Sequence, residues 1–87
     1  MITQTVQIKN PLGLHARPAN TFVKLAVKYK SNITFTKDQK NFNAKSILSV
    51  MAAGAKQGSS IELVCDGEDE HTAMQSLIEA IESGLGE

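Results

Sequence analysis

A ten-residue segment near the start of the chain, residues 10–19, constrains the fold more than any other part of the sequence. It reads Asn-Pro-Leu-Gly-Leu-His-Ala-Arg-Pro-Ala, and we interpret it as a strand end, a tight turn and the first turn of a helix that begins at Ala16. Gly13 gives the turn its freedom, and Pro18 fits the first helical turn, where its missing N–H leaves no bond unmade. This helix start places His15 at the N-cap.

His15 is an unusual N-cap, because that position normally takes Ser, Thr, Asp or Asn. The first amides of the helix, those of Ala16 and Arg17, together with the positive end of the helix dipole, predict an anion site. The dipole stabilises an anion by only about 0.3–1 kcal/mol, whereas each charge-assisted hydrogen bond adds about 1.5–3 kcal/mol, so direct donors must dominate. Arg17 is the only arginine in the chain, and its planar fork suits phosphate oxygens.

A nucleophilic imidazole beside an anion cradle is what reversible phosphorylation of a histidine needs. This pattern therefore predicts a phosphorylation site at His15, with Arg17 and the backbone amides around the phosphate. The alternative is a plain surface residue, because a lone histidine next to a turn is commonly exposed without a chemical role.

The length of 87 residues allows one modest core, so we expect a single domain over residues 1–87. An enclosed cavity for a large cofactor does not fit this size, and we expect neither a cofactor nor a metal. No apolar stretch approaches the length of a membrane span and no signal peptide opens the chain, which predicts no membrane insertion and a cytoplasmic location. The single Cys65 excludes an internal disulfide, and its apolar neighbours predict a buried, inert thiol.

The charge of the chain sums to zero but is unevenly distributed. All nine Lys and Arg residues lie between Lys9 and Lys56, whereas eight of the nine Asp and Glu residues follow Gln57. His15 therefore belongs to a positive half, and we expect its face to meet acidic partners and to be steered to them.

The spacing of apolar residues predicts strands and helices in the order βαββαβα. The expected strands are residues 2–8, 33–36, 42–44 and 60–65, with residues 37–41 as the loop of a hairpin. The expected long helices are residues 16–28 and a last helix from about Asp69 to Gly84. The first of these helices should pack five residues into the core: Ala19, Phe22, Val23, Ala26 and Val27.

A short helix over residues 47–53 is predicted between the third and fourth strands, with Ser46 as its N-cap and Gly54 as its stop. It carries more apolar residues than one buried face of so short a helix can hide, so part of them should stay exposed as a patch for a partner. The candidates for this patch are Ile47, Leu48 and Met51.

Strands with one polar face each predict an antiparallel sheet whose other face is covered by helices. The expected fold is of the α/β (α+β) class: an open-faced βαββαβα sandwich, with a four-stranded antiparallel sheet and three helices on one face.

Three segments, residues 12–19, 43–47 and 67–70, together resemble a known family. The family is HPr, the histidine-containing phosphocarrier of the bacterial phosphoenolpyruvate-dependent sugar phosphotransferase system, and the resemblance covers essentially the whole chain. It implies the same sandwich fold and a carrier that is not itself an enzyme: His15 accepts a phosphoryl group from enzyme I and passes it to the IIA domains of sugar permeases. It also implies that the phosphate is carried on the Nδ1 atom, with Arg17 and the helix amides around it, and we expect the carrier to be a monomer.

The same resemblance implies a regulatory role for Ser46. In the Gram-positive branch of the family, the matching serine is phosphorylated by an ATP-dependent HPr kinase/phosphorylase, and a catabolite-repression regulator is a later partner. Ile47 and Met51 agree with the pattern of that branch. The chain departs from the common residues of the branch at Leu48, Ser49, Ala52 and Ala53.

Partner docking is expected on the surface around the candidate site. Asn20, on the first helix beside the site, departs from the small residue or Thr of many relatives and should adjust partner preference. The other expected docking residues are Ile47, Leu48 and Met51.

Several alternatives remain open from the sequence. The basic half would suit a small RNA-binding module, but the four aromatic residues form no paired stacking motif and the total charge is balanced. A metal site would have to combine His15, His71 and Cys65, which lack close ligand spacing. A hydrolase would need a nucleophile with a base and an orienting residue, and none is visible. Within the family, the nitrogen-related phosphocarrier is the nearest competitor.

Overall fold

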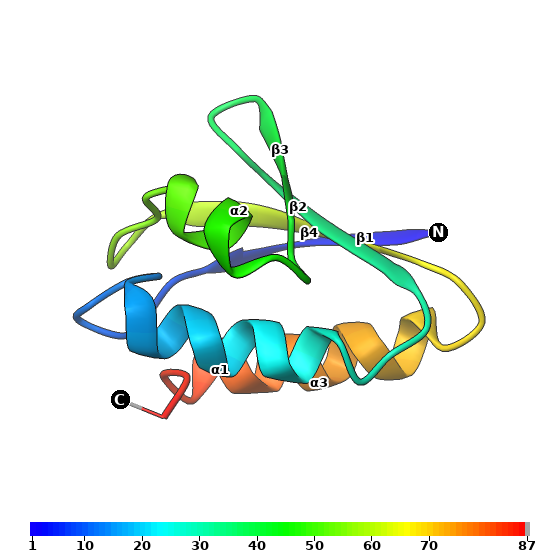
Figure 1. Cartoon of the computed structure of the whole chain (residues 1–87). Helices are drawn as coiled ribbons and strands as arrows, with labels where there is room; N and C mark the ends of the chain where they lie inside the picture. Colours follow the sequence, from blue (N-terminus) through cyan, green and yellow to red (C-terminus); the bar gives the residue numbers. More distant parts are fainter. Residues whose placement is uncertain (87) are drawn as a thin grey trace.

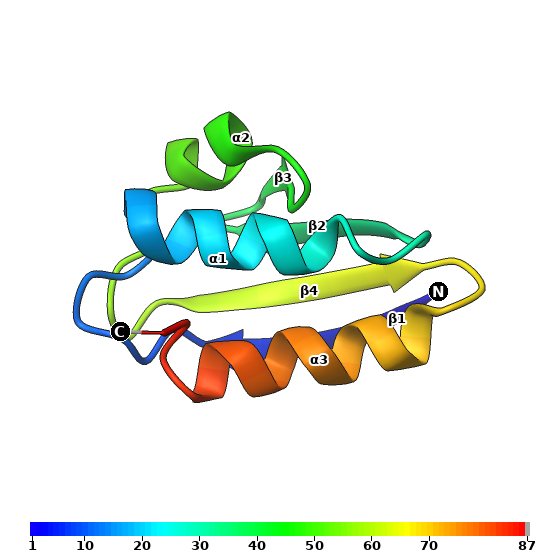
Figure 2. The same cartoon turned by 60° about the horizontal axis from the view of Figure 1, so that its bottom comes forward.

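The computed structural model describes residues 1–86, and its elements follow the predicted order. The elements are β1 (Ile2–Gln7), α1 (Ala16–Ala26), β2 (Asn32–Lys37), β3 (Lys40–Asn43), α2 (Ile47–Ala52), β4 (Ser60–Asp66) and α3 (Glu70–Glu82). Helices α1 and α3 run side by side across one face of the sheet, and the short α2 packs beside α1 (Figures 1 and 2). In the part of the chain that the structure describes, no helix has the length and apolar character of a membrane span.

The four strands form one antiparallel sheet in the order β1-β4-β2-β3. The central strand β4 alternates sharply: Ile61, Leu63 and Cys65 are buried under the helices, whereas Ser60 and Glu62 are exposed. The opposite face of the sheet is left uncovered by helices, which confirms the predicted open-faced sandwich.

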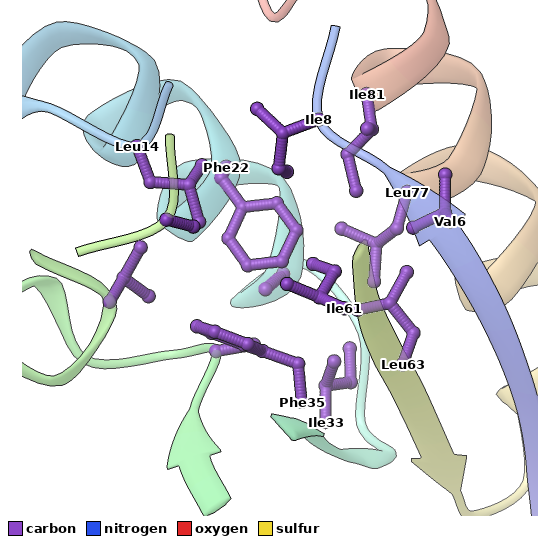
Figure 3. Packing of buried hydrophobic residues seen from close by; sticks show 14 of the residues in the cluster. Val6, Ile8, Leu14, Phe22, Ile33, Phe35, Ile61, Leu63, Leu77 and Ile81 are labelled. Carbon is purple, nitrogen blue, oxygen red and sulfur yellow. The ribbon is translucent and has the colours of Figure 1, made fainter. Parts of the chain in front are cut away.

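The hydrophobic core lies between the sheet and the two long helices (Figure 3). Phe22 of α1 meets Phe35 of β2 edge to face, with ring centroids 6.0 Å apart and an interplanar angle of 82°, a preferred geometry for aromatic pairs. Leu14, which precedes α1, is only 3% exposed and points toward Phe22 (Figure 3). The core therefore holds the chain in place immediately before His15.

The first helix ends two residues earlier than predicted, and the prediction that Val27 belongs to the core is wrong. Val27 is 54% exposed and caps the helix at its C-terminal end. Val23, one turn earlier, is already only half-buried at the edge of the buried face. After Val27 the hydrogen-bond spacing shortens to three residues, since the Lys28 amide donates to the Leu25 carbonyl at 3.2 Å. The chain then turns away from the core.

The hairpin between β2 and β3 is tighter than the predicted loop of residues 37–41. Lys37 pairs with Lys40, which leaves only Asp38 and Gln39 in the turn, with φ angles of 51° and 68°. Two successive positive φ angles are typical of a type I′ turn, whose twist matches that of the strands. The two-residue turn was not predicted, because neither of its central residues, Asp38 and Gln39, is the Gly or Asn that is common at these positions. The other elements differ from prediction by only one or two residues at their ends.

Asp69 ties the start of α3 to the loop between α1 and β2. Its Oδ2 accepts a hydrogen bond from the Lys30 amide at 2.8 Å, and its Oδ1 accepts from the Ser31 amide at 3.0 Å and the Ser31 hydroxyl at 2.5 Å. These bonds, first of all the one from the Ser31 hydroxyl, lower the pKa of Asp69 to about 2, because they favour the ionised form. These bonds fix the end of the molecule where α3 begins, which lies opposite the start of α1 (Figure 1).

We expect the Asp69 contacts to make the stability of the protein depend on acid pH. The pKa of Asp69 falls from 3.8 to about 2 on folding, so the stabilisation is complete above about pH 4 and is lost as the pH falls through 2. Asp69→Asn should therefore lower the Tm by several degrees at pH 7, and the difference from the unmodified protein should shrink toward pH 2. Thermal unfolding across this range measures it.

Glu68→Gln is the matched control, because it removes a carboxylate from the exposed neighbouring residue. It should leave the Tm nearly unchanged at every pH. A Tm difference for Asp69→Asn that stays constant from pH 2 to pH 7 would contradict the titration argument.

Candidate functional site

His15 lies at the N-cap of α1, as the sequence predicted. Its backbone is extended (φ −74°, ψ −176°) and its side chain makes no capping hydrogen bond. The His15 carbonyl accepts the first bond of the helix, from the Ala19 amide at 2.8 Å. The side chain is exposed, so the imidazole stands at the end of the helix, accessible from solvent and not used to cap it.

The turn before His15 is built around Gly13. Gly13 has a φ of +60°, its amide donates to the Asn10 carbonyl at 3.1 Å, and its own carbonyl accepts from the Asn10 side-chain amide at 2.8 Å. A Cβ at this position would lie 2.8 Å from the Lys56 Cα and closer still to the Ala55 carbonyl oxygen. Only glycine fits here, both for conformation and for space.

The start of α1 brings backbone amides and a basic residue, Arg17, close to His15 along the chain. Pro18 is buried in the first turn and has no N–H, so the amides ahead of Ala19 are those of Ala16 and Arg17. Both of these residues are exposed. Amides at a helix start, aligned with the positive end of the dipole, bind anions. The structure therefore places His15, Ala16 and Arg17 together at the start of α1.

A small hollow of about 180 Å³ opens beside His15. It forms because the Leu14 amide donates to the Ala55 carbonyl at 2.8 Å, which brings the segment after α2 against the turn before α1. The residues that line the hollow are Leu14, His15, Met51, Gly54, Ala55 and Lys56. Lys56 was not predicted to belong to the site, because it is far from His15 along the chain and reaches it only through long-range contacts such as this bond and the packing of Lys56 on Gly13.

The expected docking residues differ in their exposure. Of the three candidates for an exposed patch, Leu48 is 79% exposed and Met51 43% exposed, whereas Ile47 is half-buried and packs against the core. Asn20 is exposed on α1. Leu12, which was not among the predicted docking residues, is 47% exposed in the turn before His15. Exposed apolar side chains therefore lie on both segments that meet at the hollow.

Ser46 is the N-cap of α2, as predicted. Its hydroxyl oxygen accepts from the Ser49 amide at 3.3 Å, and its carbonyl accepts from the Val50 amide at 3.0 Å. The Ser49 hydroxyl in turn accepts from the Asn43 amide at 2.8 Å, so α2 is tied to the end of β3. Ser46 is half-buried and does not line the hollow; Met51, at the other end of α2, does.

The other candidate metal ligands, Cys65 and His71, lie apart from His15 in the fold. Cys65 is buried in β4, and burial, followed by the charges of Glu70 and Asp69, raises the pKa of its thiol. His71 is exposed and lines a second hollow between β1 and α3, away from His15. Within residues 1–86 no three His, Cys, Asp or Glu side chains are grouped so that they could hold a metal ion.

Comparison with known proteins gives matches over the whole chain. A family model described as the PTS HPr component phosphorylation site matches residues 2–83. The phosphocarrier protein HPr of Neisseria meningitidis serogroup A is 42% identical over 87 residues, which is 100% of this chain and 98% of that protein. The phosphocarrier protein HPr of Xylella fastidiosa is 44% identical over 87 residues, with the same shares covered.

The fold is similar to that of solved structures of the same kind. The crystal structure of HPr-C-His from Thermoanaerobacter tengcongensis superimposes with a TM-score of 0.97 and 47% sequence identity, and the match covers 100% of this chain and 98% of that one.

Proposed function

The chain belongs to the HPr family of phosphotransferase-system phosphocarriers, and from this premise we propose that it accepts a phosphoryl group on His15 from phospho-enzyme I and passes it to the IIA domains of sugar permeases. The observation that supports the proposal most directly is an exposed histidine at the N-cap of an eleven-residue helix, where it makes no capping bond. Because the His15 side chain does not cap the helix, its ring nitrogens are available to react with a phosphoryl group.

The proposed chemistry is a reversible displacement at phosphorus. A ring nitrogen of His15 attacks the phosphorus atom while the bond from phosphorus to its donor breaks, through a loose transition state with charge on the three equatorial oxygens. The amides of Ala16 and Arg17 and the Arg17 guanidinium would donate hydrogen bonds to these oxygens. Because all three residues are exposed, the site stabilises the phosphoryl group without enclosing it, which suits a carrier that must also release its load.

The partner proteins would supply the contacts to the transition state that this small, exposed site lacks. We infer that the chain is a carrier and not an enzyme by itself, that it works in the cytoplasm, and that its docking surface is the exposed apolar rim around His15, with Leu12, Leu48 and Met51. Arg17 and Lys56 give this rim positive charge beside the apolar residues. A partner with an acidic, partly apolar surface fits both properties.

Transfer through the whole relay tests the proposal. Incubation with phosphoenolpyruvate and a small amount of enzyme I should place acid-labile phosphate on the protein, close to one group per chain. Addition of a IIA domain should then remove this phosphate and label the IIA domain. A protein that takes up phosphate but fails to pass it to any IIA domain would contradict the carrier role.

We also propose that phosphorylation of Ser46, by an HPr kinase/phosphorylase, lowers phosphoryl transfer from enzyme I, and that the modified protein is what a catabolite-repression regulator recognises. A phosphate would add about −1.5 to −2 charge at the start of α2, next to the surface that an acidic partner approaches. Ser46→Asp should lower kcat/KM for transfer from enzyme I by about tenfold, equivalent to about 1.4 kcal/mol of repulsion. Steady-state transfer rates measure the effect.

Ser46→Ala is the control for this prediction, because it changes the same residue without adding charge. It should cost about 1 kcal/mol of stability through the lost bond to the Ser49 amide and leave the transfer rate nearly unchanged. Equal transfer rates for Ser46→Asp and Ser46→Ala would contradict the electrostatic mechanism.

A further inference from the structure

The backbone of Lys56 is fixed against the turn that carries His15. The Lys56 amide donates to the Ser59 hydroxyl at 3.0 Å, and the Lys56 carbonyl accepts from the Ser59 amide at 2.9 Å. The neighbouring Ala55 carbonyl accepts from the Leu14 amide, and the Lys56 Cα packs on Gly13 so closely that a Cβ on residue 13 would be only 2.8 Å away. The base of the lysine side chain is therefore held beside the candidate site.

The side chain of Lys56 has no structural task that explains its place. It is exposed and lines the same 180 Å³ hollow as His15. None of the ion pairs within residues 1–86 involves Lys56. A lysine with a fixed backbone, a flexible stem and an unengaged ammonium group can turn toward an anion that arrives in the hollow.

We propose that Lys56 is a second cation for the phosphoryl group carried on His15, acting from the segment after α2, whereas Arg17 belongs to α1; this inference rests on the proposed function. A phosphoryl dianion on the imidazole would stand between a planar guanidinium on α1 and an ammonium group from the segment after α2. The Lys56 ammonium would donate a charge-assisted hydrogen bond to a phosphoryl oxygen or act on it through the field.

The proposal makes Lys56 a determinant of how long the phosphorylated state lasts. Hydrolysis breaks the bond between phosphorus and the ring nitrogen while water forms a new bond to phosphorus, and the nitrogen leaves most easily when the ring is protonated. A nearby cation opposes that protonation and stabilises the dianion. Lys56 should therefore slow the spontaneous loss of phosphate and lower the pH at which the phosphoryl group takes up a proton.

Chemical phosphorylation tests this without any partner protein. Phosphoramidate transfers its phosphoryl group to the imidazole: its phosphorus–nitrogen bond breaks, a new one forms to His15, and ammonia leaves with the ring proton. For Lys56→Gln we expect phosphate loss about threefold faster than for the unmodified protein, and a phosphorus NMR titration midpoint about half a pH unit higher, as one unit charge some 6 Å away in water predicts.

Two further variants separate charge from other effects. Lys56→Arg keeps the cation and should behave like the unmodified protein in both measurements. Lys40→Gln removes an equal charge from the β2–β3 hairpin, which projects away from the start of α1 (Figure 1), and should also leave both values unchanged.

The outcomes distinguish this inference from the function on which it rests. If the unmodified protein takes up phosphate on His15 and Lys56→Gln has the same lifetime and titration midpoint, the role of Lys56 is overturned while the carrier function stands. If Lys40→Gln shifts both values as much as Lys56→Gln, only net charge matters and the role of Lys56 is again overturned. Failure of the unmodified protein to take up phosphate on His15 would overturn both.

Discussion

His15→Ala should reduce the phosphate that the protein accepts from phospho-enzyme I to background, the largest functional effect expected of any single substitution. The substitution removes the proposed nucleophile, and Arg17 and the backbone amides bind phosphate but cannot form a bond to it. The exposed N-cap position makes the loss specific, because the His15 side chain makes no capping bond. Incorporation of acid-labile phosphate, measured beside circular dichroism, checks both points.

His71→Ala is the matched control, since it removes the only other histidine of the chain. His71 is also exposed near a helix start, but it lines a different hollow, between β1 and α3. It should accept phosphate like the unmodified protein. If His71→Ala lost the phosphate label and His15→Ala kept it, the phosphorylated residue would be His71, which would contradict the proposal.

Gly13→Ala should destabilise the protein by about 3 kcal/mol, the largest stability effect expected at the candidate site. The new Cβ would meet the Ala55 carbonyl oxygen and the Lys56 Cα, and the φ of +60° would add strain for a residue with a side chain. Relief requires the turn and the segment after α2 to separate, which moves His15 as well. We therefore expect a lower midpoint in urea unfolding and slower phosphoryl transfer.

Gly58→Ala separates the effect of backbone strain from the effect of close packing. Gly58 also has a positive φ, +89°, but nothing lies within 4 Å of a Cβ built there. It should cost only the conformational strain, about 1–2 kcal/mol, and leave transfer unaffected because it does not line the hollow. Equal losses of stability in the two variants would show that the close packing of Gly13 contributes nothing.

Local signals predicted the parts of the site that lie next to each other in the chain. The turn glycine, the proline of the first helical turn and the histidine between them are separated by only a few residues, and their backbone requirements leave little choice of structure. The order of elements was predictable for a similar reason, because apolar alternation along β4 and the apolar stripe of α1 reflect which side faces the core.

Features that depend on contacts distant in sequence were not predictable in this way. The place of Lys56 follows from long-range contacts of its loop, among them the Leu14–Ala55 backbone bond and the packing on Gly13, and no local sequence pattern indicates it. Asp69 was predicted only as the approximate start of the last helix, but its carboxylate accepts hydrogen bonds from Lys30 and Ser31 of another loop.

The burial of apolar residues was hardest to predict at the ends of elements, where burial changes within one residue. Val27 continues the apolar spacing of α1 yet lies past the point where the helix leaves the sheet. Ile47 begins the short α2 and was one of three candidates for the exposed patch; it packs against the core, whereas Leu48 and Met51 are exposed. In both cases the sequence shows an apolar residue, and only the path of the neighbouring backbone decides whether it is covered.

The central claim is that the helix start and the His15 side chain hold one phosphoryl group together. Nitrogen-15 NMR of the protein before and after phosphorylation tests it most directly, since the spectra report both the modified ring and the backbone amides. We predict phosphorus bonded to Nδ1 of His15, and the largest amide proton shifts at Ala16 and Arg17, downfield as expected for new hydrogen bonds to phosphate. Phosphorus on another residue, or a phosphorylated His15 with the Ala16 and Arg17 amide resonances unmoved, would contradict the account.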